Sequence, residues 1–428
     1  MTADVTPRLH ACGTLSPIQP PSAGRLLPSD VLVNGLPPPM PNEAPGPQGG
    51  LPRLLHELRL RWHFWRHRRR PGGILLRGQH NTNYVVPLDE AFAAIVRAEP
   101  GASGKIRTPM KTVEVLPRTW READVLAAVQ PHLPAVPTCL LTRGGHALHT
   151  FTEGTPLSAH HPADEPVGEP TLRRLAEVMR RIAEVPAGEL PPLPPEWPVD
   201  DDTPAFLRTL VEFAETRVFL TYHDDFGSLF EALGITGAAA RRFQGRADDL
   251  TRRPLRLLHT DLHRDNVLRL PGEAGDLFVV DWEIALFGDP LHELATHLVR
   301  MGYGPREAER MKELWCAEMA GHGLADATRG FEDLEVYLDF ERAQSLYPDT
   351  MRTALSLSPD AGDAELRRGA RRIRRSLDNA VKAAGLARIP AEEEVMAALA
   401  DWLADQSGYR RRQRLKRRYS AGALPPPP

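Results

Sequence analysis

Apolar residues recur at two spacings along this chain, and the change of spacing divides it into parts. After Pro156 they recur every three or four residues, as in Leu172, Leu175, Met179 and Ile182. This spacing predicts helices as far as about residue 405. Two short apolar β runs, near residues 258 and 280, interrupt the helical pattern.

Between residues 71 and 155 the apolar runs are shorter and are separated by turn residues. Residues 74–88 and 90–99 are predicted to be two β-rich runs, and residues 136–142 and 146–154 two more strands. Residues 119–129 are predicted to form a helix. The chain is therefore expected to be α+β, with a small strand-rich N-lobe (71–155) and a larger helical C-lobe (156–405).

The two ends of the chain have compositions that do not favour a packed core. Residues 1–52 contain 12 of the 42 prolines, and seven of the nine residues from Arg410 to Arg418 are basic. Proline removes backbone donors and blocks helix interiors. We expect a disordered extension at 1–52 and a disordered basic tail at 406–428. A start codon at Met40 is the alternative explanation for the first stretch.

Residues 53–70 are predicted to form a basic amphipathic helix. Leu54, Leu58, Trp62 and Trp65 fall near helical spacing, among many arginines. We expect this apolar stripe to pack on the next domain while the arginines stay in solvent. The alternative is a surface that meets anionic lipid or nucleic acid.

Bulk properties narrow the class of protein. The net charge is -3, which does not indicate a strongly charged partner such as nucleic acid. Three widely spaced cysteines fit a reducing cytoplasm better than a disulfide scaffold. No stretch is long and apolar enough to span a membrane, and the first residues lack the plan of a signal peptide. We therefore expect a cytoplasmic protein.

Residues 257–290 contain the pattern of polar residues that indicates a catalytic function. His259 and Asp261 are followed by Asn266, then by an apolar strand that ends at Asp281. Phosphoryl transfer asks a protein to position the nucleophile and to neutralise charge. Asp261 is the carboxylate expected to orient or deprotonate an acceptor hydroxyl, with Asp281 and Asn266 as oxygen ligands of Mg²⁺. His259 is expected to hold the loop through hydrogen bonds.

Each of these residues alone has an ordinary structural explanation, such as a helix cap or a strand end. Their joint order, His-x-Asp-x-x-x-x-Asn, Val-Asp-Trp-Glu at 280–283 and Gly-Asp-Pro at 288–290, is far more specific. It closely resembles the aminoglycoside-phosphotransferase and choline-kinase-like family, which shares the protein-kinase fold. The resemblance covers roughly residues 72–350. It implies Asp261 as catalytic base, Asn266 and Asp281 as Mg²⁺ ligands, and ATP as phosphate donor.

The same resemblance implies roles in the N-lobe. Gly78 would belong to the turn that covers the phosphates, with Asn81 and its neighbours Thr82 and Asn83 as further donors. Arg97 would be the third-strand cation, with Lys105 as its competitor. Glu122 would be the ion partner of that cation, and residues 149–154 the hinge that binds adenine. An ordinary hairpin turn at Gly78 and a solvated Glu122 are the alternatives.

The sequence departs from the family at two positions. Asp265 stands where many relatives have a small residue, and Glu293 where they often have aspartate. Neither change removes a group that the chemistry needs.

The acceptor is expected to be a small-molecule hydroxyl. Residues 151–250 carry 18 acidic residues and 9 arginines, which suits a cationic acceptor such as an aminoglycoside or amino alcohol. Solvated helix faces are the favoured explanation of these charges. A protein Ser/Thr kinase is disfavoured because no Asp-Phe-Gly or Ala-Pro-Glu signature occurs. A nucleotide-binding pseudokinase scaffold is disfavoured because Asp261, Asn266 and Asp281 are all present.

Overall fold

The computed structural model describes most of the chain from residue 58 to residue 405. The chain divides into two compact units, Met1–Gly46 and Pro47–Pro428, and every described residue belongs to the second. The predicted extension at 1–52, the tail at 406–428 and Gly78 lie outside the described residues. The described ranges are 58–60, 62–66, 74–77, 81–99, 101–109, 113–143, 145–162, 165–272 and 276–405.

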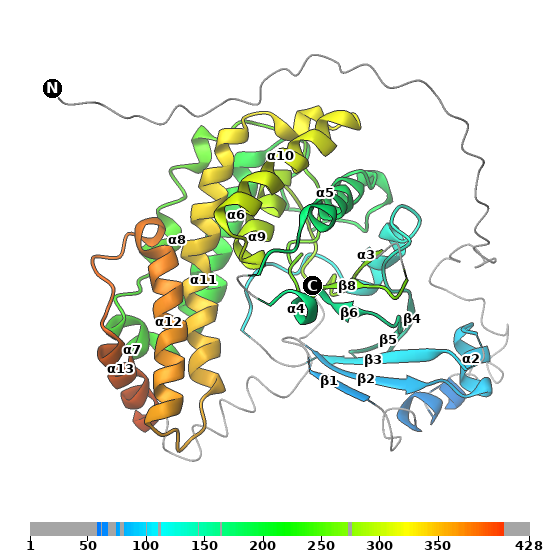
Figure 1. Ribbon diagram of the computed structural model, residues 1–428, viewed down its shortest axis with the longest axis horizontal. Helices are drawn as coiled ribbons and strands as arrows, with labels where there is room; N and C mark the ends of the chain where they lie inside the picture. Colours follow the sequence, from blue (N-terminus) through cyan, green and yellow to red (C-terminus); the bar gives the residue numbers. More distant parts are fainter. Residues whose placement is uncertain are drawn as a thin grey trace. The chain divides into compact units, whose positions relative to one another are not determined.

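A five-stranded antiparallel sheet forms the first lobe, with strand order β1-β2-β3-β5-β4 (Figure 1). Side chains alternate between the two faces of a strand. Ile106 on β3 is therefore buried in a small core on one face, while Lys105 and Arg107 point to the other. The strands are β1 (Ile74–Arg77), β2 (Asn81–Pro87), β3 (Ser103–Pro109), β4 (Cys139–Arg143) and β5 (His146–Thr150).

The expected β run at residues 90–99 is wrong, because its first part is helix α2 (Glu90–Val96). Asp89 caps this helix by accepting a hydrogen bond from the backbone N–H of Phe92, at 2.9 Å. Phe92, Ala93 and Val96 are buried at helical spacing. Arg97 is the residue that ends α2, in the left-handed conformation at φ 56°, and it is not on a strand.

A short helical segment, residues 58–60 and 62–66, packs against the same small core. Leu60 and Phe64 are buried there, and the ring of His63 stacks on Phe92 at 5.6 Å between centroids. The buried side of this segment is thus not the stripe predicted from the sequence.

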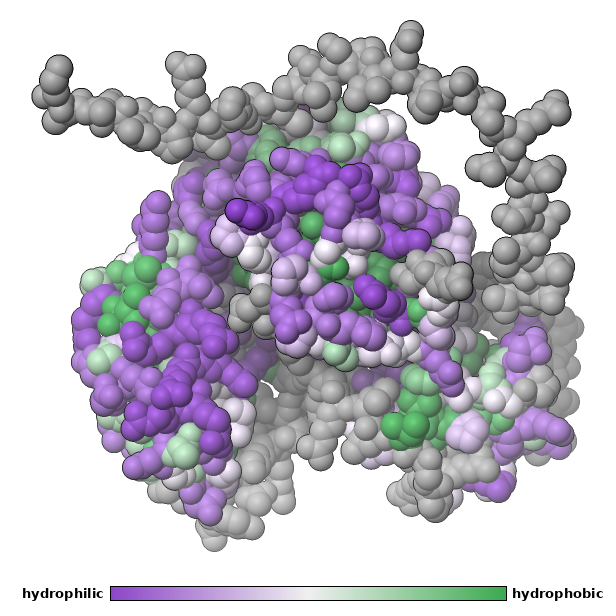
Figure 2. Space-filling view, viewed as in Figure 1, coloured by the Kyte–Doolittle hydropathy of each residue, from purple (hydrophilic) through white to green (hydrophobic). Residues whose placement is uncertain are grey.

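The second lobe is mainly helical, so the chain has the predicted α+β, two-lobe architecture. Helices α11 and α12 lie side by side and make the largest helix contact (Figure 1). On the face drawn in Figure 2, hydrophilic residues cover most of α12, while its apolar stripe faces the core. The helices are α3 (Glu122–Val129), α4 (Leu157–His160), α5 (Glu169–Ala183), α6 (Thr203–Phe213), α7 (Thr221–Ala232), α8 (Ala238–Arg241), α9 (Pro290–Met301), α10 (Pro305–Gly321), α11 (Leu334–Ser356), α12 (Asp363–Ala384) and α13 (Glu392–Asp405). No helix among the described residues is long and apolar enough to cross a bilayer.

The motif segment folds as short strands between these helices. Strand β8 (Val267–Arg269) pairs antiparallel with β9 (Leu277–Val279), which is the hairpin expected between Asn266 and Asp281. Strand β8 also pairs with β6 (Thr155–Pro156), and β7 (Arg256–Leu258) pairs with β10 (Leu286–Gly288). The loops that follow β7 and β9 therefore leave two separate small sheets.

Arg253 is a fully buried arginine that ties the start of α9 to the start of α11. Its guanidinium donates to Asp289 and to Asp333, and the hydroxyl of Tyr337 donates to Asp289 at 2.8 Å. Asp289 also caps α9 by accepting from the N–H of Leu291. The Gly-Asp-Pro motif thus serves to fix α9.

Replacing Arg253 with alanine is expected to lower the free energy of unfolding by about 3–5 kcal/mol, because two buried carboxylates lose their counter-charge. The matched control is Arg208→Ala, which breaks an exposed pair with Asp248 and should cost no more than about 1 kcal/mol. Urea denaturation of both variants measures the difference. Equal losses would show that the Arg253 cluster does not stabilise the fold.

Candidate phosphotransferase active site

The loop from His259 to Asn266 follows β7 and is held in a strained shape. Thr260 has φ 62°, in the left-handed region that side chains other than glycine rarely adopt. Its N–H donates to the carboxylate of Glu293 at 2.8 Å, and its hydroxyl donates to the carbonyl of Ile284 at 2.6 Å. Burial raises the pKa of Glu293 to about 7. The glutamate that departs from the family pattern is therefore a support of the loop.

His259 connects this loop to the strand end that carries Asp281. Its Nδ1 accepts the N–H of Asp261 at 3.2 Å, so Nε2 is left to donate to the carbonyl of Val280 at 3.1 Å. Burial lowers the pKa of His259 to about 4, which keeps the ring neutral. The Val280 N–H also donates to the carbonyl of Asn266 at 3.0 Å. These bonds hold the two parts of the motif side by side.

Asp261 receives hydrogen bonds from two side chains. The Asn266 amide donates to its Oδ2 at 2.8 Å, and Arg300 donates to its Oδ1. His263 lies 3.6 Å from the same Oδ1. Burial alone would raise the pKa of Asp261, but the charge of Arg300 and the contact with His263 outweigh it and hold the pKa below its usual range. The carboxylate is thus ionised at neutral pH.

Helix α9 supplies three polar residues to this loop from one face. Glu293, His297 and Arg300 are spaced four and three residues apart, which places them along a single side of a helix. Glu293 holds Thr260, Arg300 holds Asp261, and His297 Nδ1 donates to the carbonyl of Leu262 at 2.8 Å. Arg300 also donates to the buried Glu341 on α11, at 3.1 Å. Sequence reasoning missed Arg300, although its spacing from Glu293 and His297 was a signal.

Asp281 meets the first lobe through Arg107 on β3. Arg107 donates to Asp281 Oδ1 at 2.6 Å and, through its other terminal nitrogen, to Glu122. Burial lowers the pKa of this guanidinium, but the charges of Glu122, Asp281 and Glu283 more than offset it and the pKa is raised. Glu122 begins α3 and also accepts the N–H of Trp282 at 3.2 Å. Glu122 therefore has the ion-pair position expected for it, but with Arg107 instead of Arg97.

The prediction that Arg97 is the third-strand cation is wrong. Residues 90–96 form helix α2, so Arg97 ends a helix and does not lie on a strand. Lys105 lies on β3 itself, not in a turn, and shares a face with Arg107. Among the described residues Lys105 has no ion-pair partner, and burial, helped by Arg107, lowers its pKa to about 8. The alternation Lys105-Ile106-Arg107 after Gly104 was the signal for this strand.

The remaining first-lobe residues lie around this face. Asn81 and Asn83 are on β2, where Asn83 stands opposite Arg107 in the register. The expected hinge, residues 149–154, runs from the end of β5 to the start of β6 and so connects the two lobes. The Phe151 N–H within it donates to the carbonyl of Ser103 at 3.0 Å.

Asp265 lies at the exposed edge of the loop, with its carboxylate 3.8 Å from His263. Its side chain is 66% exposed and accepts a hydrogen bond from Ser158. Several carboxylates of the acidic stretch 151–250 are likewise paired with arginines on the surface: Glu169 with Arg310, Glu184 with Arg180, Glu215 with Arg241 and Asp248 with Arg208. These pairs fit the favoured explanation of solvated helix faces.

Asn266 and Asp281 suit a magnesium ion in their chemistry. The NH₂ of Asn266 donates to Asp261, which leaves the side-chain carbonyl oxygen as the group that could bind a metal ion. An amide oxygen and a carboxylate are hard donors, and Mg²⁺ usually binds one or two such groups together with phosphates and water. Among the described residues, no three His, Cys, Asp or Glu side chains form a metal-binding group.

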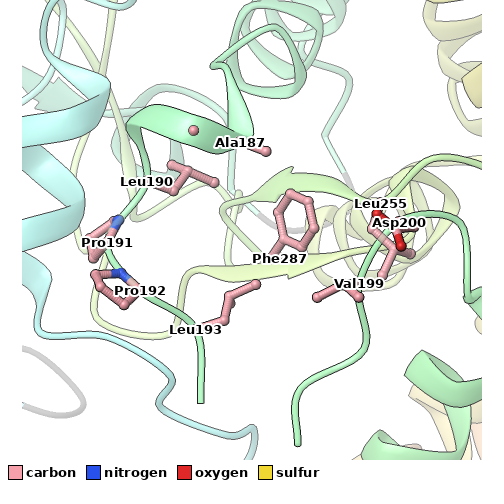
Figure 3. A pocket seen from close by; sticks show the side chains of 10 residues that line it. Ala187, Leu190, Pro191, Pro192, Leu193, Val199, Asp200, Leu255 and Phe287 are labelled. Carbon is pink, nitrogen blue, oxygen red and sulfur yellow. The ribbon is translucent and has the colours of Figure 1, made fainter. Parts of the chain in front are cut away.

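A pocket of about 500 Å³ lies on the second lobe, but none of its lining residues belongs to this constellation. Figure 3 shows Phe287, Leu193 and Val199 lining it. A second pocket, of about 450 Å³, includes Thr152 of the connection between the lobes.

The fold and this constellation define a phosphotransferase of the protein-kinase-like, small-molecule kinase type. The chain belongs to the phosphotransferase enzyme family (APH), whose family model matches residues 74–327, more than half of the sequence. The family recognised from the sequence and the predicted enzyme class are thereby confirmed. Membership implies that the enzyme uses a nucleotide.

Solved structures similar to this chain include small-molecule kinases, all at low identity. The ethanolamine kinase of Plasmodium vivax is 12% identical, with a TM-score of 0.47 over 77% of this chain and 89% of that one. Choline kinase LicA from Streptococcus pneumoniae is 14% identical, with a TM-score of 0.45 over 76% and 99% of the two chains. Macrolide 2'-phosphotransferase MphH from Brachybacterium faecium is 17% identical, with a TM-score of 0.43 over 73% and 97%. No curated protein is significantly similar in sequence.

Proposed function

We propose that this enzyme transfers the γ-phosphate of ATP, with Mg²⁺, to the hydroxyl of a small molecule. The observation that carries the proposal is the position of Asp261. Its ionised carboxylate is fixed by the Asn266 amide, and the backbone bond between Asn266 and Val280 brings the Asp281 segment beside it.

Asp261 is the proposed base. A carboxylate held in one orientation can accept a hydrogen bond from the acceptor hydroxyl and take its proton as the new bond to phosphorus forms. Arg300 and Asn266 fix this orientation, while His259 and Glu293 hold the backbone beneath it.

Asn266 and Asp281 are the residues proposed to hold Mg²⁺, which would neutralise charge on the nucleotide phosphates when bound. Lys105 and Arg107 are proposed to face those phosphates from β3. Arg107 already binds Glu122 and Asp281, so its main proposed role is to fix the position of one lobe relative to the other. Lys105, a partly buried cation without an ion partner among the described residues, is the proposed direct phosphate ligand.

Asp281→Ala is expected to weaken Mg²⁺-dependent nucleotide binding, because a metal ligand and a partner of Arg107 are lost together. Calorimetric titration with ATP, with and without Mg²⁺, measures the effect. Asp276→Ala is the matched control, since that carboxylate lies just before the same strand and is exposed. An unchanged Kd with Mg²⁺ in the Asp281 variant would contradict the assignment.

Turnover of ATP with a panel of amino alcohols, aminoglycosides and sugars tests the reaction itself. Phosphorylated product from one class of acceptor, detected by mass spectrometry, is the expected result. Nucleotide binding without product from any acceptor would favour the pseudokinase alternative. Transfer to protein serine instead would favour the protein-kinase alternative.

A further inference from the structure

The helical segment at residues 58–60 and 62–66, dark blue beside α2 in Figure 1, has an apolar side that is about half exposed. Leu58 and Trp62 are each 50% exposed, and Trp65 is 54% exposed. At about 100° per residue these three side chains fall within an arc of about 60°. Leu60 and Phe64 are on the opposite side and are buried. For these three residues the expectation that the stripe packs on the next domain is therefore wrong, and Leu54 lies outside the described residues.

Arginines accompany this exposed stripe. Arg59 and Arg66 are exposed, and the guanidinium of Arg66 lies 5.0 Å from the centre of the Trp62 ring. The sequence from 58 to 70 contains six arginines and no acidic residue, although part of that range lies outside the described residues. A ridge of tryptophan and leucine beside arginines combines apolar area with positive charge on one side of the molecule.

This combination matches the interface of a lipid bilayer. Tryptophan is enriched at the headgroup level, where its ring is partly apolar and its N–H is solvated. A surface helix of this kind buries its apolar side at the boundary of headgroups and acyl chains. Arginine adds attraction to anionic lipids, whose surface potential is negative.

We propose that Leu58, Arg59, Trp62, Trp65 and Arg66 form a docking surface for a bilayer that contains anionic phospholipid. Single-stranded nucleic acid is bound along basic grooves with aromatic platforms, whereas here the rings stand on a ridge in line with an aliphatic leucine. A second copy of the chain would bury about 800 Å² on each partner in a stable dimer. Three half-exposed side chains offer much less.

Co-sedimentation of the full-length protein with vesicles tests this surface. The protein is expected to bind vesicles of phosphatidylcholine with phosphatidylserine and not vesicles of phosphatidylcholine alone, and added salt should weaken the binding. Changing Trp62 and Trp65 together to alanine should lower the partition coefficient by about tenfold or more, since most of the apolar contact is lost. Arg59→Gln with Arg66→Gln should lower it and reduce the salt dependence.

The matched control changes Val199 and Leu220 to alanine, since these side chains are exposed to the same degree elsewhere, at 50% and 54%. That variant should bind as the wild type does. Equal binding to both kinds of vesicle, or binding unaffected by either double variant, would overturn the proposal. If the tryptophan variant fails to melt cooperatively, the arginine variant and the comparison of the two kinds of vesicle still test the proposal.

Two further measurements test whether the surface binds nucleic acid or a second copy of the chain instead. Binding of a labelled single-stranded RNA that both double variants abolish, with no vesicle binding, would overturn the proposal in favour of nucleic acid. A wild-type dimer that becomes a monomer when the tryptophans are changed, again without vesicle binding, would overturn it in favour of self-association.

Discussion

Asp261→Asn should lower kcat by about 10²–10⁴-fold, the range that a positioned general base contributes. Asparagine has nearly the same shape and can still accept the Asn266 hydrogen bond, but it cannot take a proton. The nucleotide Kd in the presence of Mg²⁺ should stay close to that of the wild type, because Asp261 addresses the acceptor. Steady-state kinetics and nucleotide titration on the same preparation measure both quantities.

Asp265→Asn is the control that makes this result specific. It removes the same charge four residues along the same loop, from an exposed side chain that pairs with Ser158. Its kcat should match that of the wild type. Because Asp261→Asn also takes a counter-charge from Arg300, a melting curve must show that the variant is folded. A folded variant with near-normal kcat would remove Asp261 from the role of base.

The second-lobe candidate site could be predicted from the sequence because its residues are close together in the chain. Asp261 and Asn266 are on one loop, and a single β-hairpin carries the chain on to Asp281, so their approach needs no knowledge of distant packing. The two-lobe α+β order followed from the change in apolar spacing. The support from α9 was harder to see, because Arg300 and Asp261 are 39 residues apart in sequence and meet only when the helix packs on the loop.

The secondary structure of the first lobe was predicted less accurately, because its apolar runs are short. Residues 90–96 contain β-branched and aromatic residues that also suit a strand, and only the cap at Asp89 and the burial of Phe92, Ala93 and Val96 make them a helix. That error moved the expected cation from β3 to Arg97. At the segment 58–66, helical spacing identified the stripe correctly, but periodicity alone does not say which of two apolar sides is covered.

Three first-lobe substitutions should therefore differ sharply in their effect on ATP. Lys105→Ala should raise the KM for ATP about ten- to a hundredfold, since loss of a charge-assisted bond costs about 1.5–3 kcal/mol and each decade is about 1.4 kcal/mol. Arg107→Lys keeps the charge but loses the fork that holds Glu122 and Asp281 together. It should lower kcat/KM by a similar factor. Arg97→Ala, at the end of α2, should leave both parameters unchanged.

The pH dependence of the KM for ATP tests more directly whether Lys105 binds phosphate. Its pKa is about 8 instead of 10.5, because of burial first and the charge of Arg107 second, with Glu122 and Asp281 acting in the opposite direction. The ammonium that would bind phosphate is thus present below pH 8 and is lost as the pH rises through that value in the free enzyme. The KM for ATP should rise above pH 8 in the wild type and stay flat in Lys105→Arg, because an arginine remains charged. A flat profile in the wild type, together with a normal KM in Lys105→Ala, would leave Arg107 as the β3 residue that binds the phosphates.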